Sequence, residues 1–108
     1  MDNDISFVCG AESQPLLEDT IGGALARAAI SWPGQEAVVC CESGVRLTYA
    51  ELNTAATQFA KGLLALALKP GDRIGIWAPN CVEWAITQYA AAKAGLILVN
   101  INPAYRKH

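Results

Sequence analysis

The residues most able to do chemistry in this sequence are four cysteines, Cys9, Cys40, Cys41 and Cys81. No two of them have the two-residue gap of a zinc knuckle or a redox motif, and no histidine lies among them. The single histidine, His108, is the last residue, which leaves no partner for a histidine-based catalytic dyad. A disulfide between Cys40 and Cys41 would be strained on a strand, where neighbouring residues point to opposite faces. We therefore expect four reduced thiols in a cytoplasmic protein.

Two carboxylates and two tryptophans are the next candidates for a site. Glu42 and Glu51 could act as general acid and base, but Glu42 falls in a turn and Glu51 suits a helix cap. Capping is the favoured interpretation of Glu51. Trp77 and Trp84 flank residues 78–80 and could form an aromatic wall beside a ligand at the carboxyl end of a strand. Their spacing favours core positions instead.

Phosphate binding is not indicated by the glycines or by the lysines. A phosphate-binding loop uses spaced glycines that open a helix after a strand, so that backbone amides can approach the anion. Gly22 and Gly23 have no strand before them, and Lys93 and Lys107 have no neighbour that suggests activation. The sequence therefore predicts no nucleotide site in this stretch alone.

The first part of the chain is predicted to form a lead-in, a helix and a hairpin. Residues 1–19 show little periodicity and are expected to be irregular. Thr20 can cap a helix that Trp32-Pro33-Gly34 ends, with Gly22 and Gly23 weakening its first turn. Residues 37–41 and 45–47 are two short strands around the turn 42–44, which predicts a hairpin.

A second helix should begin at Tyr49, because Thr48 and Glu51 have the spacing of a capping box. It should end before Pro70, and it should lie on a core through one apolar stripe. The stripe consists of Leu52, Ala56, Phe59, Leu63 and Leu66.

The rest of the chain alternates strand, helix and strand. Residues 74–78 are almost continuously apolar, which predicts a strand buried on both faces and paired in parallel. Asn80 is predicted to cap a helix over 82–94, with Glu83 at its third position, and Gly95 to end it in the left-handed conformation. That helix is apolar on every face and needs cover that little of this chain supplies. Residues 96–101 form a second buried strand.

Composition and charge exclude several classes of protein. The 108 residues are 53% hydrophobic and carry a net charge of −2, which excludes disorder and a nucleic-acid partner. The acidic N-terminus does not look like a signal peptide, and no apolar stretch is long enough for a transmembrane segment. Charged residues make up only 17% of the chain, below the usual quarter for a soluble domain, so we expect a piece of something larger.

Several sequence blocks in this order resemble the amino-terminal part of the adenylate-forming acyl-CoA synthetase (AMP-binding) superfamily. Each block alone is common, but their order and spacing make the set specific. The resemblance runs from about Thr20 to Arg106, and residues 102–106 look closest to the medium- and long-chain fatty-acyl members. The blocks are Leu47-Thr48-Tyr49-Ala50-Glu51-Leu52, Pro70-Gly71-Asp72-Arg73-Ile74-Gly75-Ile76 with Pro79-Asn80, Ala92-Lys93-Ala94-Gly95, and Asn100-Ile101-Asn102-Pro103.

The resemblance implies a fold and a reaction for the full-length protein. The fold is α/β, the N-terminal portion of the large domain of AMP-binding enzymes, with a β-hairpin followed by αβαβ and largely parallel strands. ATP and a carboxylate would give an acyl-adenylate and pyrophosphate, after which coenzyme A would displace AMP; Mg²⁺ would assist the first step. Residues 1–19 would be the lead-in and 20–108 an incomplete amino-terminal subdomain.

None of the family's catalytic equipment has a counterpart here. The phosphate loop ending in Pro-Lys-Gly, the aromatic-Thr-Glu block, the ribose-binding Asp and the catalytic Lys are absent from these residues, so no catalytic, cofactor-binding or metal-binding residue is carried over. ATP, Mg²⁺ and CoA are expected to bind the full-length protein and not this stretch alone. The partners implied are the remainder of the synthetase chain and, for the whole enzyme, a fatty acid, ATP and CoA.

Three hypotheses follow from these observations. The first is an inactive amino-terminal fragment of an ATP-dependent fatty acid–CoA ligase. The second is a small binding or regulatory module that docks on a full-length synthetase through exposed apolar faces. The third is an independent α/β domain with an unrelated ligand at the Pro79-Asn80 loop. Acyl-chain length and oligomeric state are not indicated by the sequence.

Overall fold

The computed structural model describes residues 19–105. The predicted lead-in lies outside the described residues except for Asp19, as do Arg106, Lys107 and His108. The hairpin followed by helix, strand, helix and strand confirms the α/β order predicted from the sequence. The elements are α1 (Ile21–Ser31), β1 (Glu36–Val39), β2 (Arg46–Thr48), α2 (Tyr49–Ala65), β3 (Arg73–Ile76), α3 (Val82–Ala94) and β4 (Ile97–Asn100).

Helix α1 begins at the predicted cap and packs closely on α3. The Thr20 hydroxyl accepts a hydrogen bond from the Gly23 amide at 3.0 Å. A Cβ atom at Gly22 would lie 3.1 Å from Cγ of Lys93, tighter than ordinary van der Waals contact. Packing therefore explains the glycine at position 22, because the missing side chain lets the first turn of α1 approach the last turn of α3.

Strands β1 and β2 form the predicted antiparallel hairpin, with a register shift between Glu36 and Val38. The Arg46 guanidinium and the Glu36 carboxylate form an ion pair at 2.8 Å across it. Gly44 turns the chain with a φ of +74°, and its amide donates to the Cys40 carbonyl at 2.8 Å. β1 ends at Val39, earlier than predicted, so Cys40 is at the start of the turn segment rather than in the strand.

Helix α2 starts with the predicted capping box. The Glu51 amide donates to Oγ1 of Thr48 at 3.2 Å, and the Thr48 amide donates to Oε1 of Glu51 at 2.9 Å. The predicted apolar stripe is correct at Leu52 and Ala56, which are buried, and at Leu63, which packs on the core.

The prediction is wrong at two positions of that stripe, Phe59 and Leu66, which are 43% and 73% exposed. Ala60 is buried instead of Phe59, because the later turns of α2 face α3 and the β3–β4 sheet through Ala60 and Leu63. Leu66 follows the last helical residue, and Ala67 turns the chain away with a φ of +67°.

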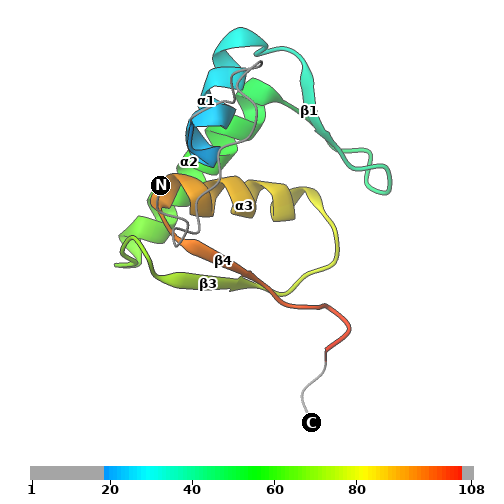
Figure 1. The fold of residues 1–108 in the computed structure, drawn as a ribbon. Helices are drawn as coiled ribbons and strands as arrows, with labels where there is room; N and C mark the ends of the chain where they lie inside the picture. The colour runs from blue at the N-terminus through cyan, green and yellow to red at the C-terminus, as the bar shows by residue number, and fades with distance from the viewer. Residues whose placement is uncertain (1–18, 106–108) are drawn as a thin grey trace, which may run out of the picture.

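Strands β3 and β4 pair in parallel, as predicted, from Arg73 opposite Ile97 to Ile76 opposite Asn100. α3 lies between this sheet and the pair α1 and α2 (Figure 1). The described residues thus contact α3 on both sides, but they bury only Val82, Ala90, Ala91 and Ala94 of this helix. Trp84, Ile86 and Tyr89 stay half-buried, in line with the expectation that this chain supplies little cover. The expectation that β3 and β4 are buried on both faces is wrong for the described residues, because α3 covers one face only.

The two ends of α3 differ in how well the sequence predicted them. Gly95 ends the helix in the left-handed conformation with a φ of 75°, as expected. The predicted cap at Asn80 is wrong, because Cys81 is the N-cap residue and its side chain makes no capping hydrogen bond to the described residues. Glu83 therefore lies at the second helical position rather than the third, where its charge still complements the helix N-terminus.

Small side chains dominate the core, which lets the helices approach one another closely. One buried cluster lies between α2, α3 and the sheet, and the other lies between α1, α2 and the hairpin. The first cluster consists of Ala60, Ala90, Ala91, Ala94 and Leu96, and the second of Leu25, Leu52 and Ala56. Among the described residues, no helix is both long and apolar enough to cross a membrane.

Candidate functional site

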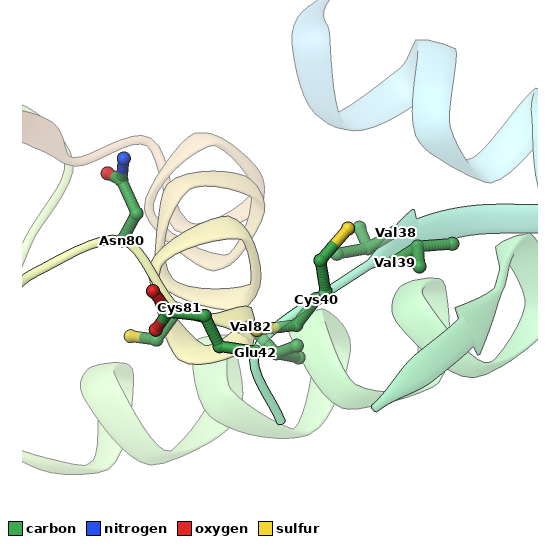
Figure 2. Close-up of a pocket in the computed structure, with 8 residues that line it drawn as sticks. Val38, Val39, Cys40, Glu42, Asn80, Cys81 and Val82 are labelled. Carbon is green, nitrogen blue, oxygen red and sulfur yellow. The ribbon is translucent and has the colours of Figure 1, made fainter. Parts of the chain in front are cut away.

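A cleft between the hairpin turn and the start of α3 gathers three of the cysteines (Figure 2). Its volume is about 310 Å³. One wall is the end of β1 with the residues that follow it, and the other is the segment that leads into α3. The lining residues are Val38, Val39, Cys40, Cys41, Glu42, Asn80, Cys81 and Val82.

Local backbone geometry places the polar groups of the cleft. Cys40 and Glu42 precede the turn at Gly44, which has a φ of +74°, and Cys81 is the extended residue, with a φ of −157°, that precedes α3. All three residues line the cleft. In Figure 2 the Glu42 carboxylate points toward Cys81 at the start of the helix, and the Asn80 amide points away. A carboxylate near a helix N-terminus is favourable, because the first amide groups of the helix carry partial positive charge.

The Cys40 thiol in this cleft has a lowered pKa. Hydrogen bonds from the side chain and then the backbone of Ser43 lower the pKa of Cys40, because they stabilise the thiolate. The charge of Glu42 opposes this shift and raises the pKa by a smaller amount. Cys40, Cys41 and Cys81 are free thiols within residues 19–105, as the sequence predicted; Cys9 lies outside the described residues.

The cleft holds free thiols, but its lining within residues 19–105 does not suit phosphate binding. A triphosphate needs cations or converging amides, whereas the charged residue that lines this cleft is the acidic Glu42. Among the described residues, no three side chains of the metal-ligating types come together to hold a metal ion. In residues 19–105 the cleft also lacks a lining histidine or lysine that could take the thiol proton.

The structure separates the other residues that the sequence singled out. Glu51 is committed to the capping box, as predicted, and does not line the cleft with Glu42. Trp84 is half-buried, whereas Trp77 is 58% exposed, so the prediction of a core position is wrong for Trp77. Neither tryptophan lines the cleft, so the two do not form an aromatic wall there.

Sequence reasoning missed that Cys40 and Cys81 line the same cleft. The two cysteines are far apart in the chain, and no motif of fixed spacing links them. Their approach depends on how the hairpin lies against α3, which is a tertiary contact. The predicted turn over residues 42–44 indicated where Cys40 would lie, but it did not indicate that Cys81 would line the same cleft.

Comparison with known proteins identifies the family. Residues 25–108 match the profile of the family described as AMP-binding enzyme, which is most of the chain. The chain belongs to the AMP-binding enzyme family. This membership confirms the resemblance that the ordered blocks between Leu47 and Pro103 indicated.

The most similar AMP-binding relatives include acyl-CoA ligases. The chain is 46% identical over 101 residues to the mitochondrial medium-chain acyl-CoA ligase ACSF2 of Danio rerio, which covers 94% of this chain and 17% of that protein. It is 42% identical over 102 residues to the same ligase of Homo sapiens, and the match covers 94% of this chain and 17% of that protein. It is 40% identical over 93 residues to the putative acyl-CoA synthetase YngI of Bacillus subtilis (strain 168), and the match covers 86% of this chain and 17% of that protein.

Solved structures of AMP-binding enzymes confirm the fold. The N-terminal domain of FACL13 from Mycobacterium tuberculosis matches with a TM-score of 0.77 and 38% identity, over 81% of this chain and 22% of that one. The N-terminal subdomain of NpsA from Klebsiella oxytoca matches with a TM-score of 0.77 and 21% identity, over 82% of this chain and 23% of that one. At this identity the match supports the fold and nothing more. The chain thus corresponds to a small part of each of these proteins.

Proposed function

We propose that this chain is the amino-terminal part of an ATP-dependent fatty acid–CoA ligase, and that medium-chain fatty acids are its substrate class. The identity of 46% to a medium-chain acyl-CoA ligase, over 94% of the chain, carries the proposal. The TM-score of 0.77 to the N-terminal domain of FACL13 supports it from the fold. Because the chain spans 17% of that ligase, the activity would belong to the whole protein.

ATP, Mg²⁺ and CoA would be held by other parts of the ligase. The residues described here do not fit ATP with its metal, because the cleft is lined by the carboxylate of Glu42 and, within residues 19–105, by no cation. An acidic lining repels a triphosphate. We therefore assign no catalytic, cofactor-binding or metal-binding residue to this chain, and we expect it to be inactive by itself.

The proposed role of this stretch is structural support within the ligase domain. Residues 20–108 would form an incomplete amino-terminal subdomain, with residues 1–19 as a lead-in before it. The partner of this subdomain would be the remainder of the synthetase chain, and no nucleic acid is expected to bind it. We place the protein in the cytoplasm, and the free thiols at Cys40, Cys41 and Cys81 are consistent with a reducing compartment.

A segment exchange tests the proposed function. The 101 residues of the Danio rerio ligase that match this chain would be replaced by the corresponding residues of this chain. The exchanged ligase should release pyrophosphate with ATP, CoA and a medium-chain fatty acid, whereas the 108-residue chain alone should release none. A folded exchanged ligase without activity would contradict the proposal, and turnover by the chain alone would show that a catalytic site is present in it.

A further inference from the structure

Three thiols from two separate parts of the chain line the cleft between the hairpin and α3. Cys40 and Cys41 follow β1, whereas Cys81 precedes α3. Cys40 and Cys81 are half-buried, and Cys41 is exposed. A second hollow of about 350 Å³ is also lined by Cys40 and Cys81, but not by Cys41. Cys40 and Cys81 are therefore the pair of thiols that shares both hollows.

Cys40 has the features of a thiol that reacts with a small uncharged oxidant. The hydrogen bonds from Ser43 lower the pKa of Cys40, and the thiolate is the form that attacks an oxidant. The carboxylate of Glu42 lines both hollows and repels anionic reagents. Hydrogen peroxide carries no charge, so this carboxylate does not exclude it.

A disulfide between Cys40 and Cys81 requires a movement of the hairpin turn. The two thiols point in different directions (Figure 2), and a disulfide holds its two Cα atoms within about 7 Å of each other. Residues 41–44 are all exposed, and a Cβ at Gly44 would meet nothing within 4 Å. The turn can therefore shift toward α3 without breaking a contact in the core.

We propose that the cleft is a site of oxidative modification, in which hydrogen peroxide oxidises Cys40 and Cys81 then joins it in a disulfide. The disulfide would tie the hairpin turn to the start of α3, and a dithiol reductant would reverse it. This modification does not depend on the ligase activity proposed above.

The reaction has two balanced steps. The Cys40 thiolate attacks one peroxide oxygen, the O–O bond breaks, and the sulfur is oxidised to a sulfenic acid; the departing hydroxide takes up the proton that Cys40 released. The Cys81 sulfur then attacks the Cys40 sulfur, the S–O bond breaks, and water leaves with the Cys81 proton. In total, two thiols and one peroxide give one disulfide and two waters.

Peptide mapping of the oxidised chain tests the proposal. The chain is treated with a small excess of hydrogen peroxide, the remaining thiols are alkylated, and tryptic peptides are separated without reduction. The expected product joins residues 28–46 to residues 74–93. Fragmentation of this product should place the bond at Cys40 rather than at Cys41, and dithiothreitol should remove it.

Three variants separate the roles of the thiols. Cys40→Ser and Cys81→Ser should each lower the yield of the linked peptides at least about tenfold, because each removes one sulfur of the bond. Cys41→Ser is the matched control, since it changes the neighbouring residue in the same way and should leave the yield unchanged. Circular dichroism of each variant checks that the fold is retained.

Other products would overturn the proposal. A bond from Cys81 to Cys41, a bond within the pair Cys40 and Cys41, or any bond to Cys9 as the main product would each contradict the pairing. Disulfide-linked dimers as the main product on a non-reducing gel would show that the thiols react between molecules instead. Sulfinic or sulfonic acid at Cys40, with the Cys81 thiol still free, would show that Cys81 does not capture the oxidised sulfur.

Discussion

Thr48 and Glu51 hold the start of α2 through two reciprocal hydrogen bonds. Hydrogen bonds from Thr48 lower the pKa of the Glu51 carboxyl, chiefly because the Thr48 amide donates to the charged form. A lowered pKa in the folded state gives stability that is present above the unfolded-state pKa and is lost as the pH falls through the folded-state pKa.

Glu51→Gln should therefore make the stability of the chain less dependent on acid pH. Gln keeps an acceptor for the Thr48 amide, so α2 should remain capped. Urea unfolding, followed by circular dichroism between about pH 6 and about pH 3, should show a smaller loss of stability in the variant than in the native chain. Glu83→Gln, for which no such pair of bonds exists in the described residues, is the control. Equal pH dependence of the native and Glu51→Gln chains would contradict this account.

The second residue-scale prediction concerns the thiol of Cys40. Ser43→Ala removes the side-chain hydrogen bond that contributes most to lowering the pKa of Cys40. Because the thiolate is the reactive form, alkylation of Cys40 at about pH 7.5 should be slower in the variant, and its pH–rate curve should move to higher pH. Peptide mass spectrometry can follow Cys41 in the same sample as an internal control. An unchanged rate at Cys40 would show that Ser43 does not tune this thiol.

At the scale of the elements, glycines decide how two of the helices end or continue. Gly95 ends α3 with a φ of 75°, and a Cβ there would lie 3.3 Å from Cβ of Pro70. Gly62 lies inside α2, where a Cβ would meet nothing within 4 Å. The same substitution should thus have opposite effects at the two positions.

Gly95→Ala should destabilise the chain by about 1 kcal/mol, because alanine disfavours the left-handed conformation. Gly62→Ala should stabilise it by about 0.5–1 kcal/mol, because alanine loses less backbone entropy in a helix. Urea unfolding of both variants beside the native chain provides the measurement. Effects of the same sign at the two positions would refute the assignment of Gly95 as the helix-ending residue.

The α2–α3 contact also explains why the predicted stripe on α2 failed at Phe59. Periodicity alone identified an apolar face, but it could not show that Ala60 rather than the neighbouring Phe59 would be buried. The structure places Ala60 against Ala90, Ala91 and Ala94, where only small side chains allow the two helices to approach.

At the scale of the whole molecule, apolar side chains are exposed on several of the described elements. Ile30 of α1, Phe59 of α2 and Val99 of β4 are examples. A dye that binds exposed apolar surface should bind the chain alone strongly and the exchanged ligase weakly. Fluorescence of the dye, compared at equal protein concentration, checks this. Equal binding by the two proteins would indicate that the remainder of the domain does not cover these side chains.

The sequence by itself determined the helix starts at Thr20 and Thr48, the end of α3 at Gly95, the hairpin and the parallel pairing of β3 with β4. Capping, turn formation and hydrophobic patterning act over a few residues, so they can be predicted without knowledge of the fold. The family resemblance was equally accessible, because its blocks are short and lie in a fixed order.

Only the tertiary structure decided which apolar residues are covered and which side chains meet. Trp77 and Val99 are as apolar as core residues, yet they are exposed because α3 packs on the other face of the sheet. Cys40 and Cys81 share a cleft because the hairpin lies against α3. Burial and convergence depend on contacts between residues distant in the chain, and local sequence patterns do not encode these contacts.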